Sequence, residues 1–353
     1  MQSTFCYAYY ALVIKTFRYR IKDATDGTKL DKLARSVNFV WNFCNETQEH
    51  ALRWHRWGNK YRRAVAGPMT VGYGYLIAAV AANEQLDVAG AEAHLRHAIR
   101  IALLPSGRPT YIAKLAGALL GELLYERGEL AEAEVLLDEA AALGDEGGIV
   151  DVMLATYRAG AYVKNARGDT AAAEQRLSDG ITRARNLALP RLEAGLKLAQ
   201  VRLAALSGTE LDKSLIRRIM AHGLQDLDEI GDLTAEFRED AQIRVLLLDG
   251  RPEALASACE RAKARLDHVD KLQRPRAHLQ TRIQYARCLA AAGMDEKAQW
   301  VLAPALKTCA ALGLSRLLTD EGPAILRVAH DVAVGWEAID AGTAADISDF
   351  VHK

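Results

Sequence analysis

Motifs that would indicate an enzyme or a metalloprotein are missing from this chain of 353 residues. It contains no GxxxxGK[ST] loop to hold the phosphates of a nucleotide, no GxSxG turn to carry a serine nucleophile and no HExxH pair to bind zinc. His94 and His97 lie three residues apart without a cysteine cluster beside them, and we interpret them as a surface pair on a helix. We therefore predict that the protein is not an enzyme and has no catalytic, cofactor-binding or metal-binding residues.

Cysteines and long uncharged stretches are also scarce. The five cysteines are odd in number, widely spaced and without a CxxC pair, which argues against a disulfide framework or a structural zinc site and favours free thiols in a reducing cytoplasm. The N-terminus lacks the positive charge of a signal peptide, and the longest uncharged stretch, 64–83, contains one proline and three glycines. We expect a cytoplasmic protein with no membrane partner, in which residues 64–83 form a loop and a buried helix.

The chain as a whole carries no net charge, but its charges are unevenly distributed. Lys and Arg number 45, and so do Asp and Glu, which excludes a uniformly basic nucleic-acid-binding protein. Residues 1–63 nevertheless hold 12 basic and five acidic residues, together with 12 of the 23 aromatic residues. This change in composition predicts a basic aromatic N-terminal part, 1–66, then a helical part, 67–330, and a C-terminal tail, 331–353.

Glycine-centred turns recur through the helical part at an almost constant spacing. The glycines lie at positions 128, 168, 208, 250 and 293, at intervals of 40, 40, 42 and 43 residues. Such a period is typical of stacked helical hairpins, in which glycine adopts the left-handed conformation that ends one helix before the next folds back. The sequence therefore predicts an all-α, tetratricopeptide (TPR)-like helical-hairpin solenoid of about six repeats of about 40 residues, with a small N-terminal strand-plus-helix segment.

A small–large–small apolar set follows several of these turns. Ala133, Leu137 and Ala140 lie 5, 9 and 12 residues after the first glycine, and similar sets follow the second and the fifth. This spacing puts all three residues on one helical face, where small residues allow close approach of a neighbouring helix. An earlier unit at 86–98 has the set without the glycine. The unit after the third glycine is the weakest, because Lys213 and Arg217 occupy two of the three positions.

Two segments of the helical part, 120–134 (LGELLYERGELAEAE) and 312–323 (LGLSRLLTDEGP), resemble the TPR sensor domain of MalT-like regulators in the LuxR group. The resemblance covers about residues 70–330 and implies a sensor or protein-interaction module that takes part in transcription regulation and binds a protein or a small inducer in the groove of the solenoid. In that family an ATP-binding domain precedes the array and a helix-turn-helix domain follows it. Neither is recognisable here, so we expect a truncated form.

The N-terminal part carries a second resemblance. Residues 13–22 alternate between apolar and basic side chains, which predicts a strand with one basic face, and a helical pattern follows from residue 28. With residues 30–46 (LDKLARSVNFVWNFCNE) they resemble the N-terminus of the OrfB/TnpB transposase-associated proteins, which contacts nucleic acid. We therefore place a candidate DNA- or RNA-binding surface at Lys15, Arg18, Arg20, Lys22, Arg35, Arg53 and Arg56. The alternative is that the aromatic residues simply pack a small core.

Four tyrosines are the candidates for contacting a ligand in the groove. Tyr125, Tyr157, Tyr162 and Tyr285 lie on the first helices of repeats, whose surface usually lines the concave side of a solenoid. They either bind a ligand or a partner helix or serve as half-buried packing. The acidic pair at 320–321 lies beside a turn, and we interpret it as helix capping.

Two functions remain open. The first is a non-catalytic TPR-like sensor or protein-interaction module of a MalT-like (LuxR-group) transcriptional regulator. The alternative is a nucleic-acid-binding protein that uses the basic transposase-like N-terminal segment, with the helical part forming a homodimer.

Overall fold

The computed structural model of the protein describes residues 68–144, 149–221, 233–272, 274–337 and 350. The strand and helix expected within residues 1–66 lie outside this part of the chain. The described residues are almost entirely helical, and their only β-type pairing is a single antiparallel bridge between Leu103 and Pro109. The predicted all-α, TPR-like solenoid is confirmed.

Six helix pairs follow one another along the described residues. They are α4 (Pro68–Glu84) with α5 (Val88–Ile101), α6 (Tyr111–Glu126) with α7 (Leu130–Ala141), a composite helix of α8 (Val150–Leu154), η2 (Ala155–Ala159) and α9 (Gly160–Ala166) with α10 (Thr170–Asn186), α11 (Pro190–Ser207) with α12 (Lys213–Met220), α13 (Leu233–Asp249) with α14 (Pro252–Val269), and α15 (Pro275–Ala291) with α16 (Asp295–Leu312). A 3-10 turn, η3 (Asp270–Leu272), follows α14, and α17 (Arg316–Thr319) and α18 (Pro323–Glu337) close the chain. The tail predicted to begin at 331 therefore starts within α18.

The turn inside each pair is formed as the sequence predicts. All five spaced glycines have positive φ angles, between 65° and 88°. The first pair lacks the glycine, and there Leu86 takes the same left-handed conformation at φ 61°. An L-residue pays a steric penalty in this region, which is why glycine serves at the other turns.

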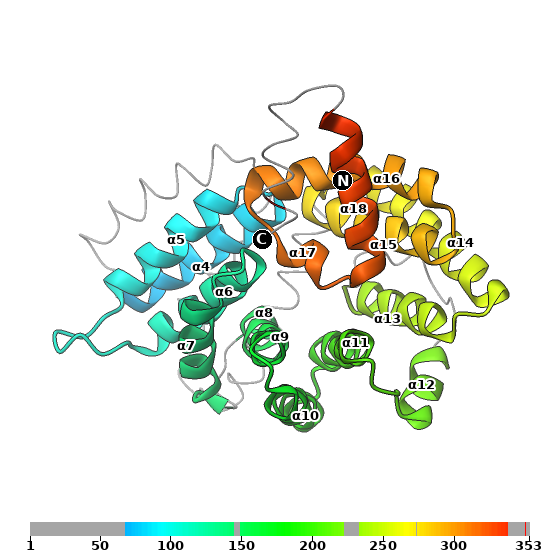
Figure 1. Ribbon diagram of the computed structural model, residues 1–353. Coiled ribbons are helices and arrows are strands. Elements are labelled where there is room, and N and C mark those ends of the chain that lie inside the picture. The colour runs from blue at the N-terminus through cyan, green and yellow to red at the C-terminus, as the bar shows by residue number, and fades with distance from the viewer. Residues whose placement is uncertain (1–67, 145–148, 222–232, 273, 338–349, 351–353) are drawn as a thin grey trace.

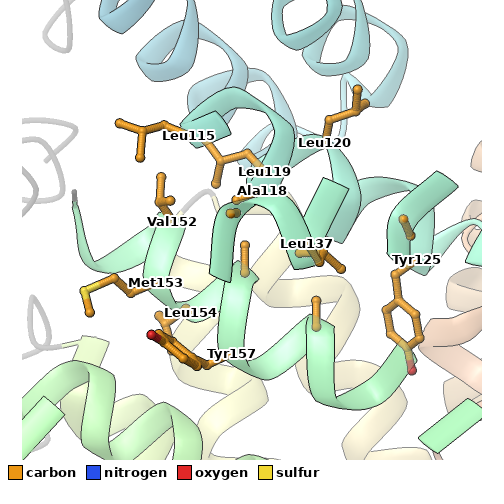
Figure 2. Close-up of a cluster of buried hydrophobic side chains, with 14 of the residues drawn as sticks. Leu115, Ala118, Leu119, Leu120, Tyr125, Leu137, Val152, Met153, Leu154 and Tyr157 are labelled. Carbon is orange, nitrogen blue, oxygen red and sulfur yellow. The ribbon is translucent and has the colours of Figure 1, made fainter. Parts of the chain in front are cut away.

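The small–large–small sets lie between the helices. Ala133, Leu137 and Ala140 are at most 2% exposed, and the corresponding residues of α5, α10 and α16 are buried as well. Figure 2 shows side chains of α6, α7, α8 and η2 gathered in one such apolar layer. The weakest unit also behaves as expected: α12 has eight residues, and it buries Leu215 and Ile219 in place of the exposed Lys213 and Arg217.

The helix pairs curve until the two ends of the solenoid meet (Figure 1). Helix α15 contacts α4, and α17 contacts α6. The C-terminal hydrophobic core accordingly includes Val88, Ala91 and Leu123 from the first two pairs. Residues of the first helices α4, α6, α11, α13 and α15 line the cavities on the concave side of the solenoid, and we call this space the lumen.

Candidate functional site

The lumen contains two adjoining cavities of about 160 and 130 Å³. Glu122, Arg158, Phe237, Arg265 and Gln280 line both of them, together with Glu236. These residues come from α6 and η2 on one side of the ring and from α13, α14 and α15 on the other. A molecule bound there would contact both halves of the solenoid.

The inner helices carry charged or polar residues at intervals of four, and this spacing places them on the face of the helix that lines the lumen. The sets are Glu122 and Glu126 on α6, Arg158 and Tyr162 on η2 and α9, Glu236, Asp240 and Arg244 on α13, and Arg276, Gln280 and Gln284 on α15. Residues four apart share one face of a helix. This periodicity of polar side chains on otherwise apolar helices is the sequence signal that could have identified the site.

The turn between α17 and α18 inserts two acidic side chains, Asp320 and Glu321, into the lumen, and we call it the acidic turn. Arg244 donates two hydrogen bonds of 2.8 Å to the Glu321 carboxylate, Arg287 donates one of 3.0 Å and Arg202 one of 3.2 Å. Only 5% of the Glu321 side chain is exposed. A single buried carboxylate therefore holds guanidinium groups from three inner helices, α11, α13 and α15.

The electrostatics of the acidic turn differ between its two carboxylates. Burial alone would raise the pKa of Glu321, but the guanidinium groups of Arg244, Arg202 and Arg287 hold it far below its ordinary value. Burial raises the pKa of the neighbouring Asp320, and the charges of Arg202 and Arg316 only partly oppose this. The arginines thus favour the ionised form of Glu321, whereas burial disfavours the ionised form of Asp320.

Asp320 joins the acidic turn to the second helix pair. The Tyr125 hydroxyl donates a hydrogen bond to Asp320, and Arg316 forms an ion pair with the same carboxylate at 2.9 Å. Arg316 also lies over the Tyr125 ring, 5.1 Å from its centroid. Burial and the nearby Asp320 charge raise the pKa of Tyr125, so its hydroxyl remains the donor.

A second set of polar contacts closes the ring on its other side. Arg276 of α15 pairs with Glu126 of α6 and donates a 3.0 Å hydrogen bond to Asn83 of α4. Arg276 and Glu126 are both less than 10% exposed. Buried charges need such partners, because an unpaired charge away from water is strongly destabilising. The closure of the solenoid therefore depends on ion pairs as well as on apolar packing.

The π-helical turn η2 positions Arg158 toward the lumen. Its extra residue leaves backbone carbonyls without their usual helical partners. Arg176 of α10 donates to the Thr156 carbonyl at 3.3 Å and to the Leu137 carbonyl at 3.4 Å. Arg158 then pairs with Glu122 at 2.7 Å and lies 5.7 Å from the centre of the Phe237 ring.

The structure separates the four predicted groove tyrosines into two groups. All four are at least 94% buried. All four belong to the apolar cores, but only Tyr125 and Tyr162, with ring centroids 5.8 Å apart, also line a cavity, the second one. The basic residues proposed to bind nucleic acid, Lys15, Arg18, Arg20, Lys22, Arg35, Arg53 and Arg56, lie outside the described residues.

The interpretation of the acidic pair as helix caps is wrong. Both carboxylates bind guanidinium or hydroxyl groups of distant helices, and neither caps a backbone N–H group. His94 and His97 are half-buried, and their rings contact the Tyr75 ring in tilted arrangements, with centroid distances of 5.9 and 4.4 Å. Among the described residues no cluster of His, Cys, Asp or Glu could hold a metal ion, and no described helix has the length and apolar character that a membrane span requires.

Comparison with known proteins identifies relatives of the whole array. The family model of the MalT-like TPR region matches residues 39–333. The serine/threonine-protein kinase PknK of Mycobacterium tuberculosis (strain H37Rv) and that of Mycobacterium bovis are each 40% identical to this chain over 267 residues. The aligned region is 75% of this chain and 23% of each kinase, so the chain spans about a quarter of the length of these relatives.

Proposed function

The chain belongs to the family of MalT-like TPR regions, and from this premise we propose that it is a non-catalytic sensor module of a transcriptional regulator of the MalT-like (LuxR) group. In this role the ring of helix pairs binds a small inducer in its lumen. PknK, which is named a serine/threonine-protein kinase, contains a region similar to this chain within a much longer protein. This supports a role as one module of a larger regulatory protein.

The size of the lumen favours a small molecule over a protein partner. An α-helix with its side chains is about 10–12 Å across, and drug-sized ligands occupy about 300–1,000 Å³. The two cavities hold about 160 and 130 Å³ and are bordered by buried ion pairs. A peptide helix would have to break these ion pairs to enter, whereas a small metabolite would not.

The contact between the two ends of the solenoid is the observation that carries the proposal. Helices α6 and η2 from one half and α13 to α15 from the other share one lining. A ligand that binds both halves stabilises the closed ring relative to any more open form, and differential affinity of this kind is what a sensor requires.

Thermal unfolding in the presence of a metabolite library tests the proposal. We expect at least one compound to raise the melting temperature saturably and to slow amide exchange in α6 and α13–α15. The Phe237→Ala variant, which alters the lining of both cavities, should lose this response. Trp300→Ala is the control, because Trp300 is 79% exposed on the outer helix α16. A library without a stabilising compound, or robust ATP hydrolysis by the purified chain, would contradict the proposal.

The second candidate function is nucleic-acid binding by the N-terminal segment. It is favoured by the excess of seven positive charges within residues 1–63. We propose salt-dependent binding of DNA or RNA by the full chain, with the logarithm of the affinity falling as the logarithm of the salt concentration rises. Changing Arg18, Arg20 and Lys22 together to Glu should abolish this binding, and an unchanged affinity would rule out the role.

A further inference from the structure

Arg265 differs from the other arginines of the lumen in having no acidic partner among the described residues. It lies on α14, lines both cavities and is half-buried. Within the part of the chain that the structure describes, its one hydrogen bond is a 3.1 Å contact from Nη1 to the amide oxygen of Gln284. Its Nε atom is buried and unpaired.

The other guanidinium groups that line the cavities are each paired with a carboxylate. The pairs are Arg158 with Glu122, Arg191 with Asp151, Arg202 with Glu321, Arg244 with Asp240 and Glu321, Arg274 with Glu236, Arg276 with Glu126, and Arg316 with Asp320. Arg265 is therefore the one guanidinium group in the described lining of the cavities that has no carboxylate partner, and an anion in the lumen would complete the same pairing there.

Arg261, one turn earlier on the same helix, shows that a guanidinium of α14 binds a carboxylate. Its Nε and Nη2 atoms donate to the two oxygens of Glu239 at 2.8 and 2.6 Å. This parallel pair of bonds is the strongest geometry between a guanidinium and an oxyanion. In Arg265 the same two atoms make no hydrogen bond with any described residue.

We propose that the lumen binds a small molecule bearing one oxyanion, a carboxylate or a phosphate, through the Nη2 end of the Arg265 guanidinium, since Nε is buried. This inference rests on the sensor function proposed above and names the class of its ligand. The half-buried Phe237 ring, which lines the same cavities, offers a surface for the apolar part of the molecule. The ligand thus contacts α14 through Arg265 and α13 through Phe237, much as the acidic turn joins three inner helices through its own carboxylate.

Isothermal titration calorimetry on the full chain, at constant ionic strength, tests the proposal with three probes of similar size. Benzoate carries a carboxylate, phenyl phosphate carries a phosphate, and benzyl alcohol is neutral. We expect one of the two anions to bind saturably, one per chain, and benzyl alcohol to bind at least tenfold more weakly. The anion that binds distinguishes a carboxylate ligand from a phosphate ligand.

Three variants assign the binding to the Arg265 fork. Arg265→Gln should weaken anion binding at least tenfold, and Arg265→Lys, which keeps the charge but not the fork, should give an intermediate affinity. Arg251→Gln is the matched control, because Arg251 is paired with Asp249 on an exposed turn, and it should bind within twofold of the wild type. Circular dichroism should show all three variants folded, since Arg265 forms no ion pair within the described residues.

Several results would overturn the inference. They are the absence of saturable binding by both anions, equal binding of the neutral probe, or wild-type affinity in Arg265→Gln. If the metabolite library yields only neutral ligands that depend on Phe237, the sensor function stands and the anion site fails. If benzoate or phenyl phosphate binds through Arg265 while no metabolite stabilises the protein, the site stands and the sensor function fails.

Discussion

Replacing Glu321 by Gln should destabilise the closed solenoid more than any other single change that preserves side-chain shape. The wild-type carboxylate accepts four hydrogen bonds of 2.8 to 3.2 Å from three arginines. Arg244 would keep Asp240 as a partner, but Arg287 has no other ion pair among the described residues. Removing one partner of a buried charge cluster costs about 3–5 kcal/mol of unfolding free energy, and we expect a loss of this size at pH 7.

Asp320→Asn is the matched control, because it makes the same chemical change one residue away. Asparagine still accepts the hydrogen bond from Tyr125, and the change removes a charge that burial disfavours. The lost ion pair with Arg316 and the relieved burial cost oppose each other. We expect the unfolding free energy to change by about 1 kcal/mol or less.

The two variants should also differ in their pH dependence. The folded pKa of Glu321 is far below its ordinary value of 4.5, so its stabilisation is fully present above that pH and is lost as the pH falls below it. The difference in unfolding free energy between the wild type and Glu321→Gln should therefore be constant from pH 8 to about pH 5 and shrink at lower pH. Asp320 has a raised pKa, so its ionisation lowers stability as the pH rises above its ordinary value of 3.8. The unfolding free energy of Asp320→Asn, relative to that of the wild type, should therefore increase as the pH rises.

Urea unfolding followed by circular dichroism at 222 nm, between pH 4 and pH 8, measures both effects. Urea is preferred to guanidinium chloride because it does not screen ion pairs. Amide exchange should show the opening of contacts between α17 and α6 in Glu321→Gln. A loss below about 1 kcal/mol in Glu321→Gln, or equal losses in the two variants, would refute the view that the acidic turn holds the ring closed.

Three further substitutions test the repeat architecture by the same unfolding assay. Leu177→Ala removes a core side chain that is 1% exposed and should lower the unfolding free energy by about 2–5 kcal/mol. Val135→Ala, at a 58% exposed site, should change it by no more than about 0.5 kcal/mol. Similar losses in the two variants would contradict the assigned packing. Ala188→Gly should raise stability by about 0.5 kcal/mol, because Ala188 is exposed with φ at 51°, and a lower melting temperature would disprove this. Gly128→Ala, with φ at 85° and Ser315 Oγ 3.3 Å from the added methyl, should lose about 1–2 kcal/mol; an unchanged midpoint would argue against the left-handed turn.

The candidate site was less accessible to sequence reasoning than the fold. All four tyrosines lie on inner helices and pack into the cores, but only Tyr125 and Tyr162 also line a cavity. An inner helix has both a lumen face and flanks against its neighbours. Which of these a tyrosine occupies depends on the exact rotation of the helix, and here η2 changes that rotation between Tyr157 and Tyr162.

The sequence by itself determined the elements that depend on local interactions. A glycine ends a helix through its own φ angle, and a small–large–small set acts over about two turns of one helix, so the period and the buried faces follow from neighbouring residues. The closure of the ring was decided only by the tertiary structure. Tyr125 and Asp320 are 195 residues apart, and Glu126 and Arg276 are 150 apart. These pairs meet because small rotations between successive helix pairs add up around the solenoid, and no short segment of sequence encodes that sum.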